Sequence, residues 1–277
     1  MTRILAIANQ KGGVGKTTTT LALGAALAER GQRLLLVDLD PQSSLTVASG
    51  LEPNDLSETV YTAITHYLKE QEALPLAPIL CPLRPYLDLL PANIDLAVAE
   101  MELQNAVRRE YILGEILAPA HDAYDVVLVD CPPSLSLLTV NALTAAEAVL
   151  IPLVPEYLAA RGLGLLIGSI SRVRKAKLNP TLAIAGVILT MVDNRTSHGR
   201  ETAGSVRAHL CGQAPVLGEV KRNIKAAEAA AAGVPVVQYA ARSDAAQAYG
   251  QIADVLLASW SNTVSNNSTP QGELVRA

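Results

Sequence analysis

The feature that most constrains the fold of this chain is a glycine-rich segment between an apolar run and an aliphatic, helix-forming run. The segment is Lys11-Gly12-Gly13-Val14-Gly15-Lys16-Thr17-Thr18, and it lies between residues 4–8 and residues 21–29. This order predicts a strand, a loop and a helix whose N–H groups surround a phosphate. In such a loop Lys16 reaches the outer phosphates and the Thr17 hydroxyl binds Mg²⁺. We therefore expect a site for a nucleoside triphosphate with Mg²⁺.

The loop departs from the usual phosphate-loop pattern at its first position. That pattern places a glycine five residues before Gly15, where this chain has Gln10, and a second lysine follows at Lys11. Lys11 lies too early in the loop to share the role of Lys16. It can instead reach a phosphate held by a neighbouring subunit, or it can be a solvated surface lysine. The residues alone leave both interpretations open.

The composition sets the class of protein. Half of the 277 residues are hydrophobic, Phe is absent and aromatic residues make up 3%, so the core has to be aliphatic. The apolar runs are shorter than the ~20 residues of a membrane span, and we expect no signal peptide at the N-terminus. Cys81, Cys131 and Cys211 lack metal-ligand spacing. We expect a cytoplasmic protein with free, mostly buried thiols.

Strand-like and helix-like segments alternate along the chain. Strands are expected at 33–40, 86–90, 124–130, 148–154 and 182–191, and helices at 135–146, 158–177, 200–211, 223–232 and 243–260. One or two helices are expected between 95 and 119. This alternation predicts an α/β fold with a mostly parallel twisted sheet and helices on both faces. We expect one P-loop domain over residues 1–261, with a disordered polar tail at 262–277.

Three carboxylates end two of the predicted strands. Asp38 and Asp40 end one strand and Asp130 ends another. Because ligands of such sheets bind beyond the carboxyl ends of the strands, these groups are expected to meet the glycine loop. Asp130 fits the carboxylate that holds Mg²⁺. Asp38 and Asp40 are expected on one face of their strand, where one can orient the attacking water and the other can support Mg²⁺ or the loop; their spacing leaves the roles open.

The net charge of −4 conceals a segregated distribution of charge. Residues 161–225 carry eleven Lys/Arg and three acidic residues, whereas the rest of the chain has a net charge of −12. This predicts a basic face for a polyanion, although the same cations can be spread over several faces or complement a helix C-terminus. Arg222 and Lys225 can alternatively contact nucleotide. The candidate DNA-binding residues are Arg172, Arg174, Lys175, Lys177, Arg195, Arg200, Arg207, Arg222 and Lys225.

At these motifs the chain resembles the ParA/MinD group of deviant Walker ATPases, and within it the ParA/Soj partition proteins. The resemblance is carried by residues 8–18, 38–42, 130–134, 140–143 and 156–157, and it extends over about residues 2–258. It implies that Lys11 reaches the nucleotide of the partner subunit in an ATP-sandwich homodimer. It also implies that Lys16 and Thr17 serve phosphate and Mg²⁺, that Asp40 assists the water, and that Asp130 is the Walker B carboxylate. Asp38 stays a candidate Mg²⁺ ligand beside Thr17 and Asp130.

The resemblance also implies partners. The ATP-bound dimer is expected to bind double-stranded DNA without sequence preference, and a ParB-type partner is expected to stimulate a weak ATPase. The protein is then associated with the nucleoid, and its cargo is a plasmid, a chromosome or a protein body such as a carboxysome. The chain departs from the family pattern at Lys221-Arg222-Asn223, where relatives often have Pro-Arg-Asn, so adenine contacts are not implied there.

Two other members of this superfamily fit the sequence less well. A MinD-like membrane-associated ATPase needs a basic amphipathic C-terminal helix, and the only cation in residues 262–277 is Arg276. We therefore expect no membrane partner. An iron–sulfur reductase needs paired cysteines for its cluster, and only Cys131 lies near the expected site.

Overall fold

The computed structural model describes residues 2–156 and 159–266, and its centre is an eight-stranded sheet in the order β3-β4-β2-β5-β1-β6-β7-β8. The antiparallel strand β3 (Cys81–Arg84) lies at one edge, next to β4. The parallel strands are β1 (Arg3–Ile7), β2 (Leu34–Asp38), β4 (Leu87–Leu90), β5 (Val126–Asp130), β6 (Ala148–Leu153), β7 (Ala183–Val192) and β8 (Val216–Lys221). The sheet is therefore mostly parallel, as expected.

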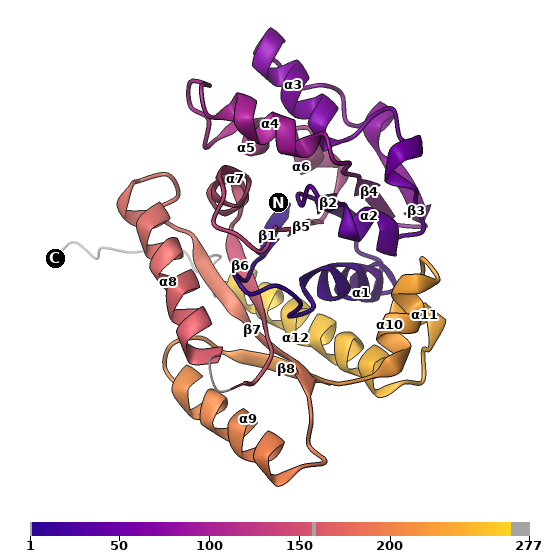
Figure 1. Cartoon of the computed structure of the whole chain (residues 1–277), viewed down its shortest axis with the longest axis vertical. Helices are drawn as coiled ribbons and strands as arrows, with labels where there is room; N and C mark the ends of the chain where they lie inside the picture. The colour runs from indigo at the N-terminus through magenta and orange to yellow at the C-terminus, as the bar shows by residue number, and fades with distance from the viewer. Residues whose placement is uncertain (1, 157–158, 267–277) are drawn as a thin grey trace, which may run out of the picture.

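Side-chain alternation along the strands builds one apolar core on each face of the sheet. In β1, Ile4 and Ala6 belong to one core, and Leu5 and Ile7 to the other. Helices cover both faces (Figure 1), as buried parallel strands require. The first core is covered by α3 (Val60–Glu70), α4 (Leu96–Leu103), α5 (Ile112–Leu117), α6 (Ala120–Ala123), α7 (Leu137–Ala145), α8 (Ala159–Lys175) and α9 (Ser197–Leu210). The second is covered by α1 (Lys16–Ala28), α2 (Ser44–Ala48), α10 (Ile224–Ala231), α11 (Val236–Tyr239) and α12 (Asp244–Asn266).

The predicted single α/β domain is confirmed, but the sequence pattern missed two strands. Strand β3 contains Pro82, and residues 81–84 are not among the strands expected from the sequence. Proline is tolerated in β3 because the strand lies at the edge of the sheet. Strand β8 lies at the opposite edge, where its side chains are mostly half-buried, so its apolar alternation is weak.

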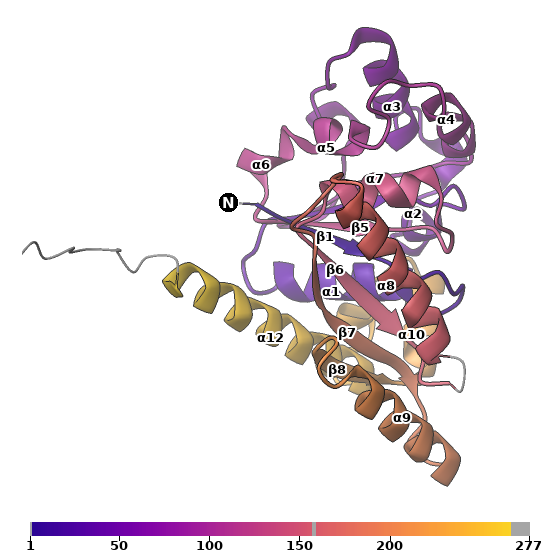
Figure 2. The same ribbon diagram turned by 90° about the vertical axis from the view of Figure 1, so that its left-hand side faces the viewer.

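The strand order brings the chemically interesting segments to one edge of the sheet. β5 lies between β1 and β2, with Asp130 level with both Ile7 and Asp38. β1, β2 and β5 thus end together. Figure 2 shows the β1–α1 loop at this edge, on the side away from the N-terminus. The predicted convergence of the glycine loop with the strand ends at Asp38 and Asp130 is therefore seen in the backbone.

The C-terminal helix is longer than expected. α12 continues to Asn266, so residues 262–266 of the expected disordered tail are helical, and residues 267–277 lie outside the described residues. None of the helices described here is long and apolar enough to cross a membrane.

Candidate nucleotide site

The loop between β1 and α1 leaves the N-terminus of a helix open to an anion. Gly13 and Gly15 have φ angles of 72° and 85°, in the left-handed region that glycine adopts at little cost. Gly15 is the N-cap of α1, no side chain caps the helix, and its first turn contains no acidic residue. Since the first N–H groups of a helix have no partner within it, this end can accept a phosphate group.

Two buried side chains fix the loop to the neighbouring strands. Asn9 donates to the Pro152 carbonyl oxygen at 2.7 Å and accepts from the Lys11 amide at 3.0 Å. On the other side, the Thr190 hydroxyl in β7 donates to the Val14 carbonyl oxygen at 2.8 Å. The loop is therefore held from β6 and from β7. Sequence reasoning did not predict the role of Thr190.

The two lysines of the loop lie in different environments. Lys16 is buried, with 8% of its surface exposed. Burial raises the pKa of Asp130, and the charge of Lys16 offsets part of that rise. The Lys11 side chain is half-exposed and forms an ion pair with Glu156. Lys11, Gly12 and Gly13 form the exposed outer side of the loop. Lys16 therefore belongs to the interior of the site and Lys11 to its surface.

Asp130 lies directly beside the first turn of α1. Its Oδ2 accepts a hydrogen bond from the Thr17 hydroxyl at 2.7 Å, and its Oδ1 accepts one from the Thr20 hydroxyl at 3.3 Å. Burial raises the pKa of Asp130 to about 8, and the charge of Asp38 adds to the shift. A buried carboxylate next to a hydroxyl is a donor set that suits Mg²⁺. Thr20 was not predicted, because a threonine inside a helix carries no distinctive sequence signal.

Asp38 and Asp40 differ from each other more than their spacing suggested. Asp38 is fully buried: its Oδ2 accepts from the amide and the hydroxyl of Thr46, both at 2.8 Å, and its Oδ1 accepts from the Asp40 amide at 3.2 Å. Burial raises the pKa of Asp38 to about 6. Asp40 is half-buried, and its Oδ1 accepts from the Gln42 amide at 3.0 Å.

The expectation that both carboxylates share one strand face is therefore wrong. β2 ends at Asp38, so the alternation of a strand does not extend to Asp40, which lies in the following turn. The charge of Asp40 raises the pKa of Asp130, which places Asp40 near the site. Asp38 is enclosed by hydrogen bonds, whereas Asp40 remains accessible to water.

The described residues suit a metal ion only together with a ligand. Among them no group of three His, Cys, Asp or Glu side chains is placed to hold a metal. In nucleotide sites Mg²⁺ usually takes one or two carboxylates and completes its shell with phosphate oxygens and water. Thr17 and Asp130 can supply the protein ligands of such an ion, and a phosphate bound at the open helix N-terminus can supply the others.

The basic residues do not form one continuous group. Arg174 donates from Nε to the Leu182 carbonyl oxygen at 2.7 Å, and Leu182 directly precedes β7. Arg195 lies just beyond the other end of β7. Ten residues of strand separate these points, about 33 Å. Arg172, Lys175 and Lys177 share the end of α8 with Arg174, and Arg207 lies in the last turn of α9; Arg195, Arg200, Arg222 and Lys225 follow the carboxyl ends of β7 and β8.

Several of these cations already have acidic partners. Ion pairs join Arg195 to Asp193, Arg207 to Glu219 and Lys225 to Glu228. Within the part of the chain that the structure describes, no ion pair is found for Arg172, Arg174, Lys175, Lys177, Arg200 or Arg222. These six exposed cations have charge available for a polyanion.

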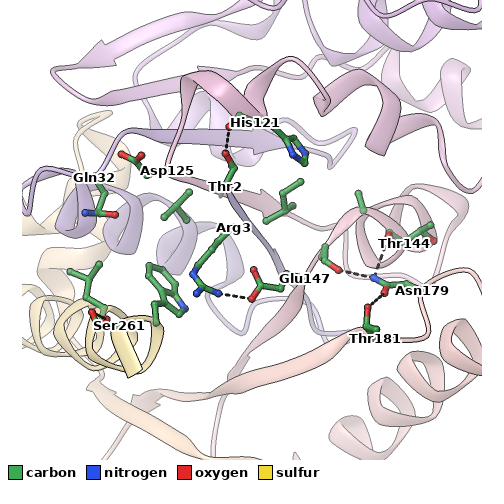
Figure 3. Close-up of a pocket in the computed structure, with 16 residues that line it drawn as sticks. Thr2, Arg3, Gln32, His121, Asp125, Thr144, Glu147, Asn179, Thr181 and Ser261 are labelled. Carbon is green, nitrogen blue, oxygen red and sulfur yellow. Dashed lines mark hydrogen bonds and ion pairs between the residues drawn. The ribbon is translucent and has the colours of Figure 1, made fainter. Parts of the chain in front are cut away.

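The opposite edge of the sheet contains a cavity of about 980 Å³ (Figure 3). Its polar groups bind one another. Arg3 contacts Glu147 at 2.5 Å and lies over the Trp260 ring at 5.3 Å, and the Thr2 hydroxyl donates to the His121 carbonyl oxygen at 2.5 Å. The cavity lies at the amino ends of the strands and has no glycine loop, so it is not the nucleotide site.

The expectation of mostly buried thiols is correct for one cysteine only. All three are free, but Cys81 is half-buried and Cys211 is exposed. Cys131 is buried directly after Asp130, and burial raises the pKa of its thiol. The three cysteines lie on β3, after β5 and after α9.

The parallel sheet, the phosphate-binding loop and the adjacent Thr17–Asp130 pair define a P-loop nucleotide-binding protein. A family model described as an AAA domain matches residues 2–184. The chromosome partitioning protein ParA of Caulobacter vibrioides is 44% identical over 253 residues, which cover 91% of this chain and 92% of that protein. The chain belongs to the ParA/Soj family of P-loop ATPases.

Two further comparisons agree with this family. The sporulation initiation inhibitor protein Soj of Bacillus subtilis is 41% identical over 91% of this chain and 97% of its own. A crystal structure named cobyrinic acid a,c-diamide synthase, from Mycobacterium smegmatis with bound ADP and magnesium, is 41% identical. It has a TM-score of 0.81 and covers 95% of this chain and 97% of its own. The same protein was also crystallised with an ATP analogue and magnesium.

Proposed function

We propose that this chain is an Mg²⁺-dependent ATPase that forms an ATP-sandwich homodimer and binds double-stranded DNA without sequence preference. In this proposal it drives partition of a plasmid or chromosome with a ParB-type partner that stimulates a weak intrinsic activity. The observation that carries the proposal is the open N-terminus of α1 beside the Thr17–Asp130 pair, with a second lysine on the outer side of the same loop.

In the proposed mechanism each residue of the site has a separate role in ATP hydrolysis. The loop amides and Lys16 bind the phosphates, and Thr17 and Asp130 hold Mg²⁺, which neutralises charge on the phosphate oxygens. Asp40 is the group that can orient the attacking water, because it is accessible while Asp38 is enclosed. Asp38 supports the site by holding the turn that carries Asp40 rather than by facing solvent.

The position of Lys11 supports a dimer. A cation that binds only the nucleotide of its own chain would lie inside the loop, as Lys16 does. Lys11 lies on the exposed side and pairs with Glu156, an exposed contact worth at most about 1 kcal/mol. Its ammonium group can therefore leave this weak pair for a phosphate held by a second copy of the chain.

DNA binding is supported by the cations that lack acidic partners. Non-specific DNA binding depends mainly on Lys and Arg and on the release of counterions, so it weakens as salt increases. Dimerisation doubles the number of cations presented to one duplex. ATP should therefore raise DNA affinity by pairing two copies, which would associate the protein with the nucleoid.

The proposal is tested by measuring molar mass and DNA binding on the same samples. In the hydrolysis-deficient Asp40→Ala background, ATP and Mg²⁺ should convert monomer to dimer in multi-angle light scattering. They should also increase the anisotropy of a labelled duplex of arbitrary sequence. Lys11→Ala should bind ATP but remain monomeric and bind DNA weakly. A monomer at saturating ATP, or equal DNA binding by Lys11→Ala and its parent, would rule out dimer-gated binding.

Two alternative functions can be distinguished from DNA partition by measuring which compounds or partners stimulate ATP turnover. A positioning ATPase for a protein cargo would share this site, and it would be stimulated by a cargo adaptor rather than by a DNA-bound partner. The name of the Mycobacterium smegmatis relative suggests ATP-dependent amidation of a corrin acid. ATP turnover that depends on such an acid and an amine donor would favour that activity. We expect DNA, and not these compounds, to increase turnover.

A further inference from the structure

Thr46 lies outside every motif that identifies the site, and yet it makes the closest contacts to one of its carboxylates. It is the third residue of α2 and is fully buried. Its amide and its hydroxyl both bind the same oxygen of Asp38, each at 2.8 Å. One side chain and one amide thus converge on Oδ2 of a buried carboxylate.

The direction of these hydrogen bonds is fixed by a third contact. The Ala92 amide, just beyond β4, donates to the Thr46 hydroxyl oxygen at 3.0 Å. A hydroxyl group has a single proton, and with the oxygen accepting from Ala92, that proton is directed to Asp38. Thr46 therefore joins the ends of β2 and β4 through one oriented hydroxyl.

The Asp38 carboxylate in turn holds both ends of a short segment. Its Oδ1 accepts from the Asp40 amide at 3.2 Å, and its Oδ2 accepts from Thr46. The segment between them contains Asp40 and is closed further by the Ser43 amide, which donates to the Asp40 carbonyl oxygen at 2.8 Å. The direction in which Asp40 points is therefore set through Asp38.

We propose that Thr46 is a positioning residue for ATP hydrolysis, which holds the Asp38 carboxylate so that the following turn presents Asp40 to the attacking water. The proposal rests on the proposed ATPase function. It predicts that Thr46 affects the rate of the chemical step and leaves ATP affinity unchanged, because the hydrogen bonds that hold the phosphate loop come from Asn9 and Thr190 and not from α2.

Three variants test the role of the hydroxyl. Thr46→Val removes the hydroxyl at nearly constant volume, and Thr46→Ser keeps it. Thr144→Val is the matched control, because it removes a hydroxyl that donates to the Val140 carbonyl oxygen at 2.8 Å within α7, at the other edge of the sheet. Each variant is compared with the parent in single-turnover hydrolysis and in equilibrium binding of a fluorescent ATP analogue with Mg²⁺.

Thr46→Val should slow the single turnover by about tenfold or more, equivalent to about 1.4 kcal/mol, with ATP affinity within about twofold of the parent. Thr46→Ser should restore most of the rate, and Thr144→Val should match the parent. The proposal is overturned if Thr46→Val hydrolyses ATP at the parent rate. It is also overturned if Thr46→Ser is as slow as Thr46→Val, or if rate and affinity fall together. A parent protein without ATPase activity would instead refute the proposed function.

A second measurement does not require Thr46→Val to fold. Asp38→Asn removes a buried charge and keeps its shape. Hydrogen exchange at the Asp40 and Thr46 amides should become at least about tenfold faster in Asp38→Asn than in the parent, since both amides donate to the Asp38 carboxylate. Thr144→Val should leave them unchanged. Equal protection in Asp38→Asn and the parent would mean that the carboxylate does not hold the turn, and the proposal would fail.

Discussion

Each end of β5 has one carboxylate, and the pKa values of the two carboxylates are shifted in opposite directions. Asp125, just before the strand, forms an ion pair with Arg33 at 2.8 Å, and this contact lowers its pKa. Asp130, the last residue of the strand, is buried beside Asp38, and its pKa is raised. A few residues of the same chain thus separate a carboxylate with a cationic partner from one whose nearest charged neighbours include two other carboxylates.

This difference shows which edge of the sheet is built for a ligand. At the amino edge the polar groups pair with one another, as Arg3 and Glu147 do, so they do not need a ligand to be satisfied. At the carboxyl edge burial and the charges of Asp38 and Asp40 all raise the pKa of Asp130, and Lys16 offsets only part of this shift, so a bound cation would stabilise the group. Perturbed groups of this kind concentrate at functional sites, and here they lie beside the glycine loop.

The largest expected effect concerns the accessible carboxylate of the carboxyl edge. Asp40→Ala should lower the single-turnover rate of ATP hydrolysis by about 100-fold or more, the usual contribution of a group that handles the attacking water. ATP binding and ATP-dependent DNA binding should persist, because in the proposed mechanism Asp40 holds neither phosphate nor metal. Parallel measurement of the rate, the ATP dissociation constant and DNA anisotropy checks this. Normal turnover would transfer the water-orienting role to Asp38.

The next effect concerns stability and has an unusual sign. Asp130 binds its proton more tightly in the folded state than in the unfolded state, since its pKa rises from 3.8 to about 8. The free energy of unfolding of the nucleotide-free protein should therefore fall as pH rises from about 4 through 8. Asp130→Asn should remove part of this fall and raise the Tm at pH 8 by about 3 °C or more.

The measurement is thermal unfolding between pH 5 and pH 8.5, without nucleotide or Mg²⁺. Asp88→Asn serves as a control, because this half-buried carboxylate accepts from the Tyr124 hydroxyl at 2.6 Å and lies away from the loop. A lower Tm for Asp130→Asn at pH 8 would show that Thr17, Thr20 and Lys16 compensate the charge fully. The repulsion at the carboxyl edge would then be too weak to indicate a cation site.

The sequence was sufficient to predict the carboxyl edge in outline. The glycine loop and the strands that end at Asp38 and Asp130 are local patterns, and the parallel topology that local alternation predicts brings them together. The different states of Asp38 and Asp40 could not be predicted, because they depend on where β2 ends and on a hydroxyl contributed by α2. Thr190 binds the loop across 176 positions of sequence, and no local pattern predicts such a contact.

The charge distribution along the chain was less informative than the motifs. A count over residues 161–225 predicted one basic face, but β7 places Arg174 and Arg195 at opposite ends of a ten-residue strand. Likewise no strand was expected at β3, which contains Pro82, because proline is disfavoured in central strands. β3 is an edge strand, and proline is tolerated there. Both differences arise because the order of residues along the chain does not determine where they lie in the folded structure.

The basic residues can be compared in the same way, because some have acidic partners within the chain and others have none among the described residues. Arg222→Ala and Lys175→Ala should each weaken binding to a duplex by about fivefold at moderate salt and reduce the salt dependence by about one counterion. Arg207→Ala, the control, removes a cation that is already paired with Glu219 and should have a smaller effect. Fluorescence anisotropy over a series of salt concentrations, with ATP and Mg²⁺, provides the test. Equal losses at Arg207 and Arg222 would mean that pairing within the chain does not distinguish the cations that bind DNA.

The smallest effect is expected at the amino end of β5. The pKa of Asp125 is lowered, so its contribution to stability is present above pH 4 and is lost as pH falls. This is opposite to the trend at Asp130. Asp125→Asn should lower the Tm at pH 7 by no more than about 3 °C, because the pair with Arg33 is largely exposed. ATP turnover should not change. If Asp125→Asn and Asp130→Asn shifted the Tm in the same direction at pH 8, the two ends of β5 would not differ as their environments imply, and the charge repulsion near the glycine loop would lose its value as a sign of a cation site.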